Sequence, residues 1–165
     1  MKPVAPPIEV VQADLNSREH QDAIVELVDS YAREPIAIGK PLSAEVRAGM
    51  IPGLREHPTT IVFLAYQGDE AIGIAVCFLG FSTFAARPLI NIHDLAVLPA
   101  HRARGTGRQL LAAVERKARE LGCCKLTLEV LDTNDRARRT YAAFGFAPAV
   151  HQQAAGTMLF LSKAL

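Results

Sequence analysis

Two glycines stand at the beginning of this chain's clearest helix pattern, shortly after a strong strand pattern, and this segment constrains the fold more than any other. The strand pattern covers residues 89–98, and the amphipathic helix pattern covers residues 105–121. Gly105 and Gly107 permit positive φ angles and leave room for a ligand to contact the backbone. The segment therefore favours a fold in which a helix follows a strand through an open turn.

The remaining patterns predict an α/β layered fold, a mixed sheet with helices on both faces. Expected strands cover residues 8–12, 59–66, 71–81, 89–98, 125–131 and 157–161, with a hairpin signal at residues 67–70. Four helices are expected: one capped by Asn16 or Ser17 and ending near residue 31, one opened by Ser43 and interrupted by Pro52 and Gly53, and two at residues 105–121 and 135–144.

Composition excludes several classes of protein. A chain of 165 residues, half of them hydrophobic, fits one domain with a substantial core, and we expect residues 1–165 to form it. Its net charge of +1 offers no global field for nucleic acid or an anionic membrane. The apolar runs fall short of the roughly 20 residues that span a bilayer, and the N-terminus does not resemble a signal peptide. Three cysteines without ligand spacing predict reduced thiols in a cytoplasmic protein and no metal site.

The charges around the glycines point to an anion. Arg102, Arg104 and Arg108 lie in a stretch, from residue 95 to residue 114, that contains no carboxylate. Free amides at the start of the following helix also favour phosphate. The alternative is a loop that merely joins strand to helix. A dinucleotide fingerprint is excluded because Leu110 stands where its third glycine should be, and no P-loop lysine follows.

The turn resembles that of the GCN5-related N-acetyltransferase (GNAT) family, whose pattern is Arg/Gln-x-x-Gly-x-Gly/Ala. Residues 102–107 match it at each position, and the likeness extends over about residues 59–146. It implies a mostly antiparallel central sheet and acetyl-CoA as co-substrate. The turn would hold the pyrophosphate, and the preceding strand, splayed from its neighbour, would pair with the pantetheine arm. The implied cofactor-binding residues are Leu95, Ala96, Val97, Arg102, Ala103, Arg104, Gly105, Thr106, Gly107, Arg108 and Asn134.

Tyr141 is the predicted general acid. The family has a tyrosine at this position, before a Gly-Phe pair, that donates a proton to the departing thiolate. A phenol is protonated at neutral pH yet acidic enough to share its proton with sulfur. The alternative is a tyrosine packed in the core. Asn134 precedes the same helix and is also a natural N-cap.

Three residues compete as the base that deprotonates an amine. Glu129 shares one face of its strand with Lys125 and Thr127, and apolar residues occupy the other face. Its spacing to Asn134 and Tyr141 resembles the ribosomal-protein alanine acetyltransferase branch, where the Glu is the base. Asp94 is flanked by apolar residues, which favours a carboxylate that faces a cleft or a cation. His93 could titrate near neutrality or be structural.

A second branch resemblance points to other residues. The segment 80–84, followed by His93 and Asp94, is similar to the diamine acetyltransferase branch, which has Glu-Asp in place of His93-Asp94. One negative charge for gripping a cationic substrate is therefore missing. We expect His93 and Phe84 to contact the acceptor, in a pocket built from residues 31–58 and 78–88.

Together these features predict an acetyl-CoA-dependent N-acetyltransferase. The acceptor would be a primary amine of a small molecule or a peptide N-terminus, and the resemblance suggests a homodimer. Two alternatives remain: an acyl-CoA-binding regulator without catalysis, and a nucleotide-binding domain of another kind.

Overall fold

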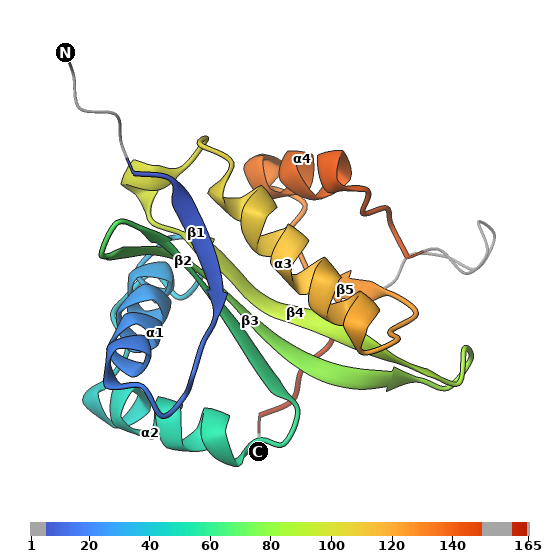
Figure 1. Ribbon diagram of the computed structural model, residues 1–165, viewed down its shortest axis with the longest axis horizontal. Helices are drawn as coiled ribbons and strands as arrows, with labels where there is room; N and C mark the ends of the chain where they lie inside the picture. Colours follow the sequence, from blue (N-terminus) through green and yellow to red (C-terminus); the bar gives the residue numbers. More distant parts are fainter. Residues whose placement is uncertain (1–5, 150–159, 165) are drawn as a thin grey trace.

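The computed structural model describes residues 6–149 and 160–164. Its sheet has the order β1-β2-β3-β4-β5, so the strands follow one another in space as they do along the chain (Figure 1). Antiparallel pairing joins β1 (Ile8–Gln12), β2 (Thr60–Gln67), β3 (Glu70–Ser82) and β4 (Arg87–Val97). The short β5 (Leu126–Leu128) runs parallel to β4. The predicted mixed, mostly antiparallel sheet is thereby confirmed.

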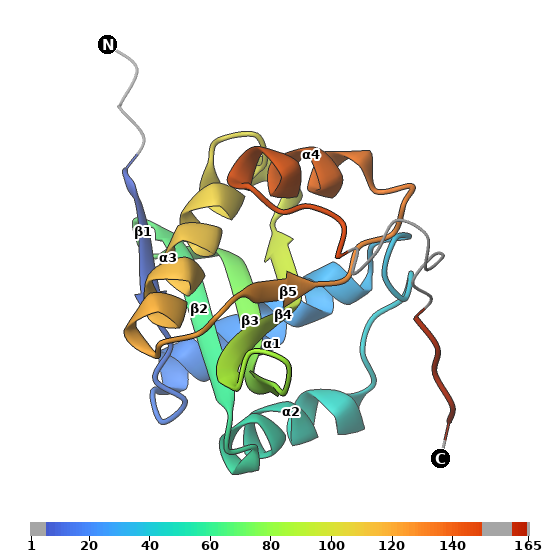
Figure 2. The ribbon, with the colours of Figure 1, turned by 90° about the vertical axis from the view of Figure 1, so that its right-hand side faces the viewer.

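Helices cover both faces of this sheet, also as predicted. The helices α1 (Arg18–Ala32) and α2 (Ala44–Glu56) lie on one face, and α3 (Thr106–Glu120) and α4 (Asp135–Phe144) lie on the other (Figures 1 and 2). A single turn of 3₁₀-helix, Pro99–His101, follows β4.

Strand alternation divides the core into two layers. Leu110 and Val114 of α3 pack with Phe63 on one face of the sheet, whereas Ile24 of α1 packs with Leu64 on the other. Successive side chains of a strand point to opposite faces, so neighbours such as Phe63 and Leu64 contribute to different layers. The two layers fix the positions of α1 and α3 on either side of β4.

A β-bulge in β4 reverses this alternation where the pairing of β4 with β5 ends. The pairing of β3 with β4 skips His93. Ile92 packs on the α3 face, yet Ala96, four residues later, packs on the α1 face. An extra residue in one strand produces this change of face. Asp94, two residues before Ala96, is therefore turned toward α1.

Side-chain caps begin three of the helices at the predicted residues. The Ser17 hydroxyl accepts from the His20 N–H at 3.4 Å, and the Ser43 hydroxyl accepts from the Val46 N–H at 3.2 Å. The Asn134 side chain caps α4 by accepting from a backbone N–H three residues on, at 3.2 Å. Such caps satisfy amide groups that have no partner within the helix.

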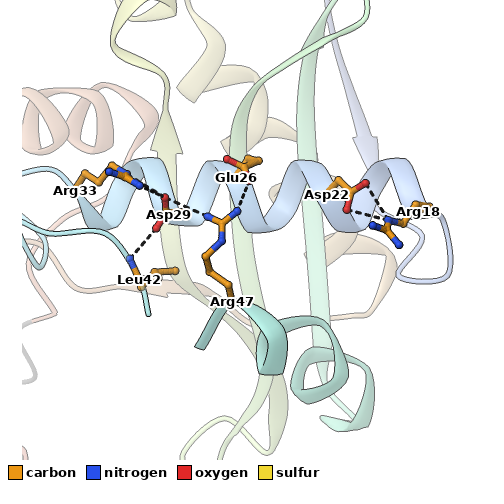
Figure 3. Close-up of polar contacts among 7 residues, drawn as sticks. All are labelled: Arg18, Asp22, Glu26, Asp29, Arg33, Leu42 and Arg47. Atoms are coloured by element: carbon orange, nitrogen blue, oxygen red, sulfur yellow. Dashed lines mark hydrogen bonds and ion pairs between the residues drawn. The ribbon is translucent and has the colours of Figure 1, made fainter. Parts of the chain in front are cut away.

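A buried carboxylate joins α1 to the segment before α2 (Figure 3). Asp29, only 4% exposed, accepts the Leu42 N–H at 2.7 Å and forms ion pairs with Arg33 at 2.9 Å and Arg47 at 3.2 Å. The Leu42 N–H, together with the two guanidinium groups, holds the pKa of Asp29 below its usual range. These contacts fix the connection between α1 and α2 beside the end of β4.

Three predicted elements differ from the structure. Pro52 and Gly53 do not interrupt α2, because both are exposed and the flanking Ile51 and Leu54 anchor the helix to the core. The strand predicted at 125–131 ends at Leu128, where β5 leaves β4. Of the strand predicted at 157–161, residues 157–159 lie outside the described part, and Phe160 and Leu161 are exposed and not in a strand.

Candidate functional site

The site lies where β4 and β5 separate. Their pairing covers three residues on each strand and ends at Ile92 and Leu128. Beyond this point the Leu98 N–H bonds to β3 at 2.9 Å. Because N–H groups alternate along a strand, those of Leu95 and Val97 face the side that β5 has left. Among the described residues, the pairing of β4 with β5 therefore ends as the sequence resemblance implied, and it leaves these two N–H groups of β4 without a strand partner.

A cavity of about 790 Å³ opens at this separation. It is lined by β4, by the turn of residues 102–107 (the glycine turn), by the residues after β5, by α4 and by the end of α1. The predicted site residues that line it are His93, Leu95, Ala96, Val97, Arg102, Ala103, Gly105, Thr106, Gly107, Arg108, Glu129, Asn134 and Tyr141.

Three predicted site residues do not line the cavity. Phe84 lies in the β3–β4 connection, at the opposite end of β4 from the glycine turn, and is 94% exposed. The long β3–β4 hairpin carries its tip away from the point where β4 and β5 separate, so a contact of Phe84 with the acceptor stays a prediction. Arg104 is exposed outside the lining, and Asp94 is half-buried on the α1 face.

The glycine turn is shaped by two left-handed residues. Gly105, at the N-cap of α3, has a φ of 84°, and Ala103 has a φ of 60°. Ala103 was not predicted to need this conformation, which costs a non-glycine residue about 1–2 kcal/mol. Thr106 is buried and donates its hydroxyl to the His101 carbonyl at 3.3 Å. Left-handed residues before a helix turn successive amides toward one concave side, which suits an anion.

Gly107 contributes space and not an unusual φ angle. It lies in the first turn of α3 and is absent from the positive-φ residues of the described chain. A Cβ atom added there would meet only the Thr140 side chain, at 4.0 Å, and would otherwise occupy the cavity. The amides at the start of α3 are thus open to a phosphate group, and the turn fits the pyrophosphate of a coenzyme A thioester.

Arg102 is committed to protein partners. Its Nε donates to the Val97 carbonyl at 2.8 Å, and its Nη2 pairs with Glu34 from the connection between α1 and α2. Glu34 and Arg102 are only 18% and 20% exposed. The sequence around Arg102 contains no carboxylate, but the fold brings one to it from Glu34, 68 residues away. No local sequence pattern could have indicated this ion pair. Arg108 remains exposed at the cavity.

Tyr141 lies in the cavity wall and is half-buried, with its ring edge-on to Phe146 at a centroid distance of 5.8 Å. Burial, together with the nearby Tyr31, raises the pKa of Tyr141 to about 12, although Arg136 opposes the rise. The phenol therefore keeps its proton throughout the neutral range. Tyr31, which the sequence did not single out, lines the same cavity from the end of α1.

The candidate bases occupy different environments. Burial raises the pKa of Asp94, and the neighbouring His93 opposes the rise. The charge of Asp94 in turn contributes to the raised pKa of Tyr31, after burial itself. Glu129 is exposed in the cavity wall just beyond β5, and the Asn91 side-chain amide donates to its carboxylate at 3.4 Å.

His93 projects from the bulge into an aromatic row. Its ring lies edge-on to Phe78 at 5.5 Å, and Phe78 lies edge-on to His57 at 4.7 Å. His93 also lines the cavity, and Phe78 packs with the core on the face of α1 and α2. The aromatic row therefore borders the cavity on that face of the sheet.

Within the described residues, no group of three His, Cys, Asp or Glu side chains could hold a metal ion. None of the described helices combines the length and the apolar character needed to cross a bilayer.

A sheet that splays between β4 and β5, with a glycine turn opening onto the splay, defines the fold of an acetyltransferase. The model of the Acetyltransferase (GNAT) family matches residues 24–146. The chain belongs to this family.

Curated relatives match over part of their length. The chain is 35% identical over 79 residues to thialysine N-ε-acetyltransferase of Bos taurus, covering 48% of this chain and 46% of the relative. It is 38% identical over 88 residues to streptothricin acetyltransferase of Streptomyces lavendulae, covering 53% and 44%. An aminoglycoside N(6′)-acetyltransferase of Salmonella typhimurium is 32% identical over 87 residues, covering 51% and 60%. The chain thus spans about half the length of the curated relatives it matches.

Solved structures share the whole fold. A probable acetyltransferase superimposes with a TM-score of 0.76 at 20% identity, covering 94% of this chain and 99% of the other. An aminoglycoside N-acetyltransferase in complex with CoA superimposes with a TM-score of 0.72 at 20% identity, covering 99% of each chain.

Proposed function

We propose that this protein is an N-acetyltransferase that moves the acetyl group of acetyl-CoA directly to a primary amine of a small molecule or a peptide N-terminus. The observation that carries the proposal is the glycine turn opening onto the free edge of β4. Membership of the acetyltransferase family supports it, as does the CoA complex of a structural neighbour.

The cavity residues suit two halves of the co-substrate. The amides from Ala103 to Arg108 would hold the pyrophosphate, while the N–H groups of Leu95 and Val97 would pair with the pantetheine arm. Asn134, the N-cap residue of α4, also lines the cavity. Acetyl-CoA supplies an activated acyl group, and the protein contributes orientation and proton transfer.

Direct transfer needs two proton movements. An alkylamine with a pKa near 10.4 arrives as an ammonium and must lose a proton before its nitrogen attacks the thioester carbonyl. As the new C–N bond forms and the C–S bond breaks, Tyr141 donates its proton to the sulfur. A phenol with an ordinary pKa near 10 already carries this proton at neutral pH, and the raised pKa of Tyr141 keeps it protonated there.

We assign the base to Glu129 because its carboxylate lies in the cavity wall, where a water or an ammonium can reach it. Asp94 is the second candidate, since burial raises its pKa toward the range in which a general base is effective. His93 is assigned to the acceptor side of the cavity together with its aromatic neighbours.

A cytoplasmic homodimer completes the proposal. Three free cysteines, one of them fully buried, suit a reducing compartment. Cell fractionation and analytical ultracentrifugation test these two points independently of activity.

Differential thermal unfolding tests the cofactor assignment. We expect acetyl-CoA to raise the melting temperature well above the effect of ATP or NAD at the same concentration, because only the thioester coenzyme fills both the turn and the β4 edge. An equal or larger shift with ATP or NAD would favour a nucleotide-binding domain and overturn the assignment.

A further inference from the structure

We infer that Glu34 is a positioning residue, which holds the glycine turn through Arg102 and couples the turn to the connection between α1 and α2. The inference rests on the proposed function, because it assigns the coenzyme to that turn. Glu34 does not contact the coenzyme in this proposal and acts through the Arg102 side chain.

The pair is built as a clamp at the end of β4. The Arg102 guanidinium reaches back to the Val97 carbonyl at 2.8 Å and outward to the Glu34 carboxylate. Arg102 directly precedes Ala103, the left-handed residue of the turn. Fixing the guanidinium therefore fixes the start of the segment whose amides face the cavity.

Glu34 is equally fixed on its own side. Its N–H donates to the Tyr31 carbonyl at 3.0 Å, and its carbonyl accepts from the N–H groups of Ala37 at 2.9 Å and Gly39 at 3.1 Å. Tyr31, Glu34 and Ile36 all line the cavity. The clamp thus connects the donor half of the cavity with the half formed by α1 and its following turn.

Burial makes each charge of the pair depend on the other. Both side chains are about four-fifths covered. Removing one charge leaves the other without its partner in a poorly solvated place, and Arg102 would then leave its position. If Glu34 acted only to neutralise Arg102, its removal would instead free a positive charge for the pyrophosphate and strengthen coenzyme binding. The two roles of Glu34 therefore predict opposite changes in acetyl-CoA affinity when Glu34 is removed.

Calorimetric titration with acetyl-CoA distinguishes these signs. We expect Glu34→Gln to weaken binding about tenfold, within the usual range of coupling between sites. Glu26→Gln is the control, because Glu26 is likewise a carboxylate from the α1 side paired with an arginine, Arg47, but lies outside the cavity lining (Figure 3). It should bind as the wild type does. Unchanged or tighter binding by Glu34→Gln overturns the inference.

Hydrogen exchange tests the coupling with a measurement that a loss of stability alone would not mimic. At saturating acetyl-CoA, we expect wild-type amides of both the turn and residues 34–41 to exchange more slowly. In Glu34→Gln the turn should still be slowed, but residues 34–41 should not. Slowing of residues 34–41 to the wild-type extent in the variant contradicts the coupling.

The design separates this inference from the proposed function. If the wild type does not bind acetyl-CoA, the proposed function fails; if the wild type binds and Glu34→Gln binds equally, only the inference fails. Should Glu34→Gln not fold, Glu34→Asp keeps the charge but shortens its reach by one methylene. It should then bind more weakly than the wild type, and wild-type affinity would overturn the clamp.

Discussion

Burial sets the chemistry of individual side chains in this cavity. The pKa of Tyr141 is raised because its ring packs against the core on the α3 face and lies edge-on to Phe146, and burial likewise raises the pKa of Asp94, just outside the cavity lining. Glu129, by contrast, is exposed in the same cavity wall. A half-buried phenol and an accessible carboxylate in one cavity wall suit the acid and the base of the proposed transfer.

Tyr141→Phe tests the acid. The ring and its packing remain, so acetyl-CoA affinity should stay close to that of the wild type, while turnover should fall on the order of 10²-fold. Tyr66→Phe is the matched control: its hydroxyl is buried without a hydrogen-bond partner among the described residues, outside the cavity lining, and its loss should leave turnover unchanged. Full activity of Tyr141→Phe across a pH series would assign the proton to another donor, with Tyr31 the next to test.

Glu129→Gln tests the base. We expect turnover to fall most at low pH, where few amine molecules are already deprotonated, and to recover partly with an amine of low pKa. Steady-state rates over a pH series, with Asp94→Asn measured in parallel, provide the comparison. A neutral Glu129→Gln beside an inactive Asp94→Asn would move the base to the bulge of β4.

The raised pKa of Asp94 has a consequence for stability. A carboxyl that holds its proton more tightly in the folded state stabilises the fold at low pH, and this contribution is lost as pH rises through the raised pKa. Asp94→Asn does not titrate, so its stability relative to the wild type should increase with pH above the ordinary pKa of Asp. Tyr31 and Cys77, whose raised pKa values also involve Asp94, titrate at alkaline pH, outside this window. Urea unfolding at several pH values checks the slope, and a relative stability that decreases with pH would contradict the burial of this carboxyl.

Among the elements, α3 and the turn before it determine where a ligand can approach. The stripe of α3 that contains Leu110 and Val114 is fully buried, so the helix cannot shift to accommodate a larger turn. Its first residues border the cavity. Gly105 is a poor probe of ligand contact, because any side chain there is strained by its φ of 84°. Gly107 has no such strain.

Gly107→Val should therefore leave a folded protein that no longer binds acetyl-CoA. The new side chain has room beside Thr140 but occupies the space in front of the amides. Gly49→Val is the control, since Gly49 lies within α2 with no atom within 4 Å of an added Cβ and outside the cavity lining. Thermal unfolding should show a coenzyme-dependent rise for Gly49→Val and none for Gly107→Val. An undiminished rise in Gly107→Val would move the phosphate site elsewhere.

Elements built on local signals could be predicted from the sequence, and those built on distant contacts could not. The cap at Ser17 and the hairpin around Gly68 depend on residues a few positions apart, and both are confirmed. The bulge at His93 depends on the register with β3. The pairing of Arg102 with Glu34 joins residues 68 positions apart, so the sequence indicated the anion-binding turn but not what holds it.

At the scale of the whole molecule, the two halves of the cavity come from opposite faces of the sheet. Tyr141 packs with the core on the side of α3 and α4, whereas Tyr31 packs with the core on the side of α1, and Glu34 follows α1 directly. These helices lie on opposite faces of the sheet (Figure 2). The cavity crosses between these faces only where β4 and β5 have separated. A donor on one side can therefore meet an acceptor on the other, and the nearly neutral chain leaves recognition to these local groups.

Incubation with acetyl-CoA and a panel of primary amines, read out as free thiol and as acetylated product by mass spectrometry, tests this arrangement. The panel should contain aminoglycosides, a lysine analogue and short peptides with free N-termini. We expect thiol release that depends on one class of amine, with one acetylated amine formed for each coenzyme A released. Acetyl-CoA binding without transfer to any amine, or thiol release without acetylated product, would contradict the assignment as an N-acetyltransferase.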